Sequence, residues 1–348
     1  MKHSIIYFVL LVIISIFTFS IYSCNKENPT TSNNPGIVDS NIFEWHVDTI
    51  HEIPMGDFYV ADSNNIFIPG NQKSVYIKNG TVNYIDHNDN NFGCNCVNGS
   101  NINNVFFGGT AKSTFRPLLK KWNGSGLIDI NVPIDSNTYI ANILALSDND
   151  IWMTTPRTSI DCFVIHFLNG SFFYNHLEHT STGGLLFMDN FGVLYMLSGK
   201  PATNNYEYVY VLKYENDTWN KITSDSVSNT SEIGGYIGFS GDKILRGGNS
   251  GIYYFTGNSW DRYISVGDNI VPKYIAAGDS PQNIMFIGRL NDQQNYIFYF
   301  DGKTIYKLPY PTTDNINYTY MKYKSGIFYL ATFDADNLNY FVTARLRK

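Results

Sequence analysis

The feature that most constrains the fold of this chain is an internal repeat of seven units. The units begin at Asp62, Ser100, Ser147, Asp189, Ser240, Asp279 and Lys324, and the starts are 38 to 51 residues apart. Each unit has a polar turn between two apolar stretches, a variable loop, a third apolar stretch, and commonly an Asn-Gly or Asp-Gly turn before a last stretch. Four antiparallel strands repeated at this period are typical of a β-propeller blade.

The sequence therefore predicts an all-β fold, a seven-bladed β-propeller of four-stranded antiparallel blades over residues 43–348. Aromatic residues make up 16% of the chain, which suits strands better than helices. The last unit ends in YFVTARLRK without a fourth strand, whereas residues 43–50, FEWHVDTI, stand outside any unit. We expect residues 43–50 to complete the last blade, with Trp45 buried there, because closure removes an unpaired edge.

One blade carries the signature of a known group. Gly247, Gly248, Tyr253 and Trp260 follow one another in the fifth unit. This pattern resembles that of the kelch-like and photosynthesis-stability-factor-like propellers. The resemblance implies the fold over the chain from residue 45 onward and names no ligand, because propellers host unrelated functions.

The N-terminus has the pattern of an export signal. An apolar run from Ile5 to Phe19 follows Lys2, and it leads to Ile21-Tyr22-Ser23-Cys24. These four residues resemble a bacterial lipobox, so we predict a signal peptide over residues 1–23 and a lipid on Cys24. The alternative is an uncleaved run that anchors the chain as a single helix. Both interpretations place the rest of the chain outside the cytoplasm.

Residues 24–42 are predicted to form a disordered tether. The stretch is rich in Asn, Thr, Ser and Pro and has little apolar surface to bury. Lys26 and Glu27 follow the lipidated cysteine, as in the export signals that the surface lipoproteins of Bacteroidota carry, which this segment resembles. We expect a lipoprotein of the cell envelope, anchored in the outer membrane and either periplasmic or surface-exposed.

Several classes of site are not expected. The net charge of −6 comes without a Lys/Arg cluster, so nucleic acid is not a predicted partner. Cys94 and Cys96 lack the Cys-x-x-Cys spacing of zinc sites. His176 and His179 would point to opposite faces of a strand, so no metal site is predicted there. We find no phosphate loop or catalytic triad, and we predict no cofactor and identify no catalytic residue.

The candidate ligand-binding residues fall in or near loops between the second and third strands of the blades. These loops are predicted at residues 110–117, 155–162, 199–207, 289–295 and 332–339. The candidates are four arginines that together could hold an acidic group, and two aromatic residues: Arg116, Arg157, Arg246, Arg289, Phe115 and Tyr206. Loops of this kind carry function on a rigid scaffold.

The sequence leads to two hypotheses of function. The first is a monomeric, lipid-anchored binding or assembly module for a glycan, peptide or protein partner. The alternative is a glycan-active hydrolase or lyase with its site in the central funnel. Three or more carboxylates or histidines at the funnel mouth would favour the enzyme, whereas an aromatic and Arg-lined face would favour the binding module.

Overall fold

The computed structural model describes residues 37–51, 56–134, 137–156, 161–178, 181–189, 191–201, 206–228, 237–240, 243–248, 251–257, 259–266, 270–278, 280, 282–290, 294–311, 316–334 and 339–347. Pro35–Lys348 form one compact unit. The predicted signal peptide, Cys24 and residues 25–36 lie outside the described residues. In the described part of the chain, no helix is long and apolar enough to cross a membrane.

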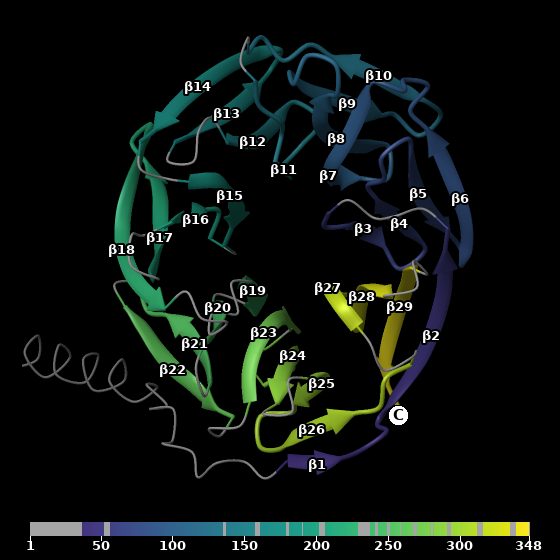
Figure 1. Ribbon diagram of the computed structural model, residues 1–348, viewed down its shortest axis with the longest axis vertical. Helices are drawn as coiled ribbons and strands as arrows, with labels where there is room; N and C mark the ends of the chain where they lie inside the picture. Colours follow the sequence, from purple (N-terminus) through teal and green to yellow (C-terminus); the bar gives the residue numbers. More distant parts are fainter. Residues whose placement is uncertain are drawn as a thin grey trace, which may run out of the picture. The chain divides into compact units, whose positions relative to one another are not determined.

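The compact unit is a ring of seven sheets, each built on four antiparallel strands, and the strand that enters each blade from the connection with the preceding blade faces the centre (Figure 1). Blades 1 to 3 contain β3 (Tyr59–Asp62), β4 (Asn65–Ile68), β5 (Lys73–Lys78) and β6 (Thr81–Asp86); β7 (Phe92–Asn101), β8 (Asn104–Ala111), β9 (Pro117–Trp122) and β10 (Leu127–Ile130); and β11 (Asn142–Ala145), β12 (Asp150–Pro156), β13 (Cys162–Leu168) and β14 (Ser171–Leu177).

Blades 4 to 6 follow the same order. They contain β15 (Ser181–Met188), β16 (Leu194–Pro201), β17 (Tyr206–Glu215) and β18 (Thr218–Ser228); β19 (Ile237–Ser240), β20 (Lys243–Gly248), β21 (Gly251–Phe255) and β22 (Trp260–Ser265); and β23 (Ile270–Ala277), β24 (Ile284–Leu290), β25 (Asn295–Phe300) and β26 (Ile305–Leu308). The predicted seven-bladed propeller is confirmed.

The last blade is closed by the N-terminal strand, as predicted. It contains β27 (Ile316–Lys324), β28 (Ile327–Asp334), β29 (Asn339–Leu346) and, outermost, β2 (Phe43–Ile50). β2 pairs antiparallel with β29 along its whole length, from Phe43 opposite Leu346 to Ile50 opposite Asn339. Phe43 and Ile50 are fully buried, whereas Trp45 is only half-buried. The buried contacts of β2 therefore come mainly from Phe43 and Ile50, and less from Trp45 than the sequence predicted.

One short strand differs from the sequence prediction. β1 (Ile37–Asp39), which falls inside the predicted tether, pairs in parallel with β26 as a fifth strand of blade 6. Ser40 N extends the pairing by donating to Lys307 O at 3.1 Å. The prediction of disorder is wrong for these residues because backbone hydrogen bonds to an open edge hold them, and such bonds need no pattern of apolar side chains.

Asn-Gly turns join the last two strands of several blades. Asn79 and Gly80, and likewise Asn169 and Gly170, have positive φ values of 49° to 85°. Each pair forms the loop of a two-residue hairpin, which requires that conformation at both positions. The turns therefore set the register of the outer strands.

The core lies between neighbouring blades. Between blades 1 and 2, for example, Phe67 stacks on Tyr76 with ring centroids 4.5 Å apart and meets Phe107 edge-on. All three rings are nearly or fully buried. Since one blade cannot bury both of its faces alone, each sheet depends on its two neighbours.

Candidate binding face

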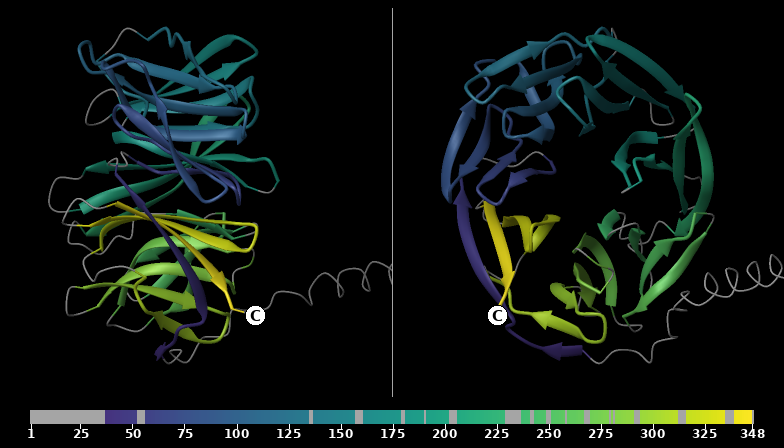
Figure 2. Two further views of the ribbon diagram at one scale, coloured as in Figure 1. Left: turned by 90° about the vertical axis from the view of Figure 1, so that its right-hand side faces the viewer. Right: turned by 180° about the vertical axis from the view of Figure 1, so that it is seen from behind.

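Antiparallel blades place their connections on two opposite faces of the ring. The loops that join second to third strands and the segments that join one blade to the next share one face, which we call the loop face. The hairpins that join first to second and third to fourth strands share the other, which we call the turn face. The side view shows the strands running between these two faces (Figure 2). The predicted binding loops therefore belong to the loop face.

Phe115 is the most unusual residue of the loop face. It lies in the loop between β8 and β9, its side chain is 60% exposed, and its φ is +50°. The other described non-glycine residues with positive φ are all Asn, Asp or Ser. A bulky residue in this conformation costs about 1 kcal/mol or more. The fold therefore holds a strained aromatic side chain in solvent.

The conformation of the Phe115 loop is fixed from one side by the segment that enters blade 2. Lys112 N donates to Asn91 O, and Ser113 N donates to Asn91 Oδ1, both at 2.7 Å. Within the loop, Phe115 N donates to Ala111 O at 2.6 Å. These bonds make the loop rigid before any ligand binds.

The segment that joins blades 2 and 3 fixes the loop from the other side. Thr138 N donates to Phe115 O at 2.6 Å, and Thr110 Oγ1 donates to Thr138 O at 3.1 Å. The Thr138 hydroxyl also donates to the carbonyl of Pro156 at the end of β12. Thr138 thus connects the loop of Phe115 to the end of β12.

Further exposed cationic and aromatic residues lie in the two segments that these hydrogen bonds join. Lys112 and Arg116 lie in the same loop as Phe115 and are exposed, and Tyr139, next to Thr138, is 39% exposed. We call Lys112, Phe115, Arg116 and Tyr139 the Phe115 corner. Two exposed cations and two exposed aromatic residues in joined segments suit a ligand that carries both a carboxylate and an apolar group.

A buried polar pair, His87 and Ser74, lies between blades 1 and 2. His87 precedes β7 and its Nε2 is 2.9 Å from Ser74 Oγ. Its ring meets Phe92 and Phe107 edge-on, and Nδ1 has no hydrogen-bond partner among the described residues. Burial, and secondarily the Lys120 ammonium, lowers the pKa of His87 to about 4. The imidazole is therefore neutral at pH 7.

The buried cysteines are not activated. Cys94 and Cys96 are free thiols at an irregularity of β7, and Cys162 is also free and buried. Burial raises the pKa of Cys94 to about 12 and that of Cys96 well above its ordinary value. Since the thiolate is the reactive and metal-binding form, these groups behave as small core residues.

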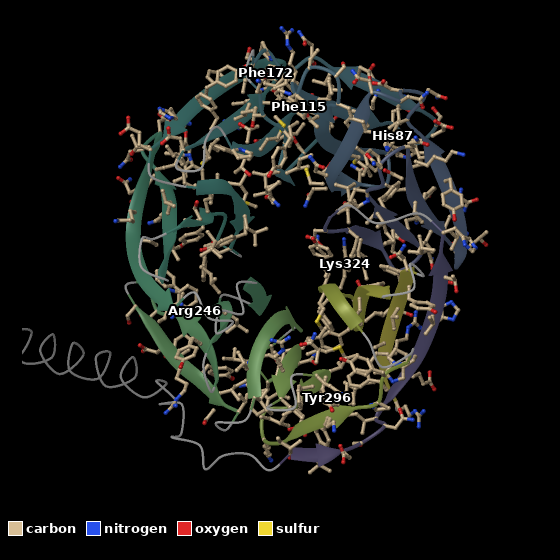
Figure 3. The ribbon with its side chains drawn as sticks, in the orientation of Figure 1. His87, Phe115, Phe172, Arg246, Tyr296 and Lys324 are labelled. Carbon is tan, nitrogen blue, oxygen red and sulfur yellow. The ribbon has the colours of Figure 1, made fainter. Side chains whose placement is uncertain are left out.

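The arginines predicted as one site are distributed over the ring. Arg116 belongs to blade 2, and Arg289 lies near the end of β24 in blade 6. Arg246 lies inside β20 rather than in a loop, and its guanidinium carbon is 4.7 Å from the centroid of Trp260 in the outer strand of blade 5. Figure 3 shows Arg246 across the ring from Phe115 and His87. Arg246 therefore packs within its own blade, away from the Phe115 corner.

Two further predicted residues can be placed only in part. Arg157 lies outside the described residues, although Pro156 before it contacts Thr138. Tyr206 begins β17, and its side chain lies outside the described part.

In blade 3, His176 Nε2 is 3.7 Å from Asp161 Oδ2, whereas His179 is outside the described residues. Among the described residues, no group of three or more His, Cys, Asp or Glu is placed to hold a metal ion.

Sequence reasoning missed Lys112 and Tyr139. Lys112 lies in the same predicted loop as Phe115, residues 110–117, so its membership of that loop could have identified it as a candidate. Tyr139 lies 24 residues further along the chain, in SNTYIAN. Only the hydrogen bond from Thr138 to Phe115 shows that the two segments meet.

The comparisons with known proteins agree on the fold. No protein-family model and no curated protein sequence matches the chain. Similar solved structures include YCF48 bound to D1 peptide, with 13% identity, a TM-score of 0.61, and coverage of 90% of this chain and 98% of that one. YCF48 from Cyanidioschyzon merolae has 16% identity, a TM-score of 0.58, and coverage of 86% and 98%.

A chain of a mitotic checkpoint complex is also similar, with 12% identity, a TM-score of 0.60, and coverage of 91% of this chain and 94% of that one. All of these identities are low, so the likeness concerns backbone architecture. A fold shared at this level does not carry a function with it. The comparisons show that this chain has the β-propeller fold.

Proposed function

We propose that this protein is a lipid-anchored binding or assembly module outside the cytoplasm, and that its Phe115 corner binds an acidic segment of a protein partner. The observation that carries the proposal is the strained, 60% exposed side chain of Phe115. Asn or Gly would fit the same turn without the aromatic surface. Folding alone therefore gives no reason for a phenylalanine at this position.

The chemistry around Phe115 suggests the kind of segment that binds. Lys112 and Arg116 flank it in one loop and provide positive charge, and Tyr139 adds a second ring. A peptide with carboxylates next to an apolar side chain matches this set. The hydrogen bonds that Asn91 accepts and that Thr138 donates order the loop in advance, which lowers the entropy cost of binding.

Two other observations support the proposal. One propeller of similar fold was solved with a bound peptide, YCF48 with D1 peptide. The residues 21–24 and the polar stretch after them resemble the lipobox and tether of Bacteroidota lipoproteins, and the fifth unit resembles kelch-like and photosynthesis-stability-factor-like blades. An anchored propeller of this kind would present its loops to partners in the envelope.

The binding proposal is tested by replacing Phe115 with Gly. This change removes the ring and relieves the backbone strain, so the protein stays folded. A display library of acidic peptides with aromatic or aliphatic residues provides the ligands, and fluorescence anisotropy measures affinity. We expect the dissociation constant to rise at least about tenfold, the effect of losing a hot-spot aromatic residue.

Phe191 offers a matched control. It is 78% exposed and lies in the hairpin between β15 and β16, on the turn face. The Phe191→Ala variant should bind the selected peptides as the unmodified protein does. Equal losses in the two variants, or a library without any ligand for the unmodified chain, would exclude the Phe115 corner as the binding site.

Anchoring is tested separately at Cys24. After labelling with a radioactive fatty acid, the unmodified chain should carry label and partition into detergent. The Cys24→Ala variant should lose the label, while Cys162→Ala, which changes a buried thiol, should keep it. Label that persists in Cys24→Ala contradicts the lipid anchor, and unlabelled chains that still partition into detergent indicate the anchoring helix instead.

A further inference from the structure

The outer strands of the blades differ in how their edges are protected. A strand at the edge of a sheet exposes backbone N–H and C=O groups, and charged residues commonly prevent another strand from pairing with it. Six of the seven outer strands contain such residues, which include Glu44 and Asp48, Asp86, Asp129, Lys221 and Asp225, Asp261 and Arg262, and Lys307. β14, with the sequence SFFYNHL, contains no Asp, Glu, Lys or Arg.

β14 is also long, regular and apolar on its surface. All seven residues pair with β13 without a bulge. Phe173 is 53% exposed and Tyr174 is 41% exposed, and as successive residues they point to opposite faces of the sheet. Phe172 and Tyr174 stack on one face with centroids 6.5 Å apart. In the described part of the chain, β14 has no strand on its outer side.

The same molecule shows that an outer edge accepts another strand. β1 adds to β26 in blade 6, whose edge is thereby covered, and it does so through only three residues. Ile37 and Val38 remain 46% exposed there, so side-chain burial contributes little and the backbone pairing suffices. β14 has more than twice that length and adds exposed aromatic rings.

We propose that β14 is a dimerisation edge, on which a second copy of this chain places its own β14 in antiparallel orientation. Self-pairing about a two-fold axis brings each residue opposite a residue of the same strand. Pairing through any other outer strand would bring charged side chains into the interface, where losing their contact with water is unfavourable. β14 brings no Asp, Glu, Lys or Arg into the interface. This differs from the monomer expected from the sequence.

The pairing makes a specific set of contacts. With the axis at Tyr174, this residue meets its own copy, while Phe173 faces Asn175 and Phe172 faces His176 of the second copy. Aromatic pairs across antiparallel strands are stabilising. The two blades form a continuous eight-stranded sheet, and each propeller keeps its Phe115 corner separate from this edge because the corner lies on the loop face.

The test introduces a charge at the axis and at a matched position elsewhere. Tyr84 in β6 is also an outer-strand tyrosine with 41% exposure. Sedimentation equilibrium of the full chain in density-matched detergent measures the dimer dissociation constant. We expect the unmodified chain and Tyr84→Lys to form dimers, and Tyr174→Lys to dissociate at least about a hundredfold more readily, because two lysines would face each other.

Thermal melting checks that the variants fold, and Asn175→Lys replaces Tyr174→Lys if the latter does not. A disulfide assay sharpens the result, since Tyr174→Cys should cross-link on mild oxidation whereas Tyr84→Cys should not. An unmodified chain that is monomeric at all concentrations overturns the proposal. So does a dimer that both lysine variants weaken equally, or one that neither weakens. A different protein captured on β14 in place of a second copy would also overturn it.

Discussion

The two N-terminal strands of the compact unit follow each other in sequence, and both add to the outside of a blade, but they are held in different ways. β2 pairs along eight residues and buries Phe43 and Ile50 completely. β1 pairs along three residues, all exposed. The comparison teaches that edge pairing alone places a strand, whereas side-chain burial determines how much stability the strand contributes.

The largest effect is expected from removing β2. Deleting residues 41–50 takes away the outer strand of blade 7 and leaves β29 as an open edge. It also removes the side chains that cover the seam between blades 6 and 7. We expect aggregation or loss of a cooperative thermal transition, measured by calorimetry. A cooperative transition at an unchanged temperature would show that β2 contributes no more than β1.

A single residue of β2 should account for a large share of that effect. Phe43 is fully buried and meets Tyr299 edge-on at 5.1 Å and Phe328 at 5.9 Å, so it joins blades 6 and 7. The Phe43→Ala variant should lose about 3 to 5 kcal/mol of unfolding free energy in urea titration. Phe43→Leu keeps most of the volume and should lose less than about 2 kcal/mol. Equal losses of unfolding free energy in the two variants would show that side-chain volume at the contact between blades 6 and 7 does not determine stability.

The contrast between buried and exposed positions extends to histidines. His87 is buried between blades 1 and 2, and its pKa is lowered from 6.5 to about 4. Between these values the unfolded chain binds a proton that the folded chain does not. The unfolding free energy should therefore fall as the pH falls from about 6.5 to 4, by up to about 3 kcal/mol, and should not change on this account above that window.

Two variants distinguish the effect of His87 on the pH dependence of unfolding from that of His46, an exposed histidine on β2. His87→Asn removes the titrating group and should flatten the decline in unfolding free energy, measured by urea titration at several pH values. His46 on β2 has a side chain that is 66% exposed, and His46→Asn should keep the decline. If the His87→Asn variant follows the same pH curve as the unmodified chain, other groups cause the acid sensitivity.

The difference between strands held by buried side chains and a strand held by backbone pairing alone explains which strands the sequence could predict. Blade strands and β2 were predictable because apolar residues recur in strands and because Asn-Gly turns mark the hairpins. β1 was not predictable, because its three residues are held by backbone hydrogen bonds, which require no recurring pattern of apolar side chains. The half-buried state of Trp45 was also missed. A tryptophan in an outer strand indicates a blade, but the sequence does not show which neighbouring residues cover its side chain.

The candidate site was predictable only in part. Phe115 and Arg116 fell in a loop whose place on the ring follows from the repeat. The backbone conformation of Phe115 is held by hydrogen bonds that Asn91 accepts from the loop and that Thr138 donates to it, and these two residues are 24 and 23 positions from Phe115 in the sequence. Arg246 was placed in or near a loop because the end of β20 is not visible in the sequence, and the structure shows the strand continuing to Gly248.

The smallest effect is expected at β1. Deleting residues 25–39 removes the predicted tether and this strand but leaves β2 in place. Because Ile37 and Val38 stay 46% exposed, the loss is limited to a few backbone hydrogen bonds at an edge, and we expect a change of about 1 kcal/mol or less in urea titration. Deleting residues 25–35 alone should change nothing measurable. A loss from the longer deletion that approaches that of Phe43→Ala would mean that β1 secures blade 6 as β2 secures blade 7, and that exposure is a poor guide to what an added strand contributes.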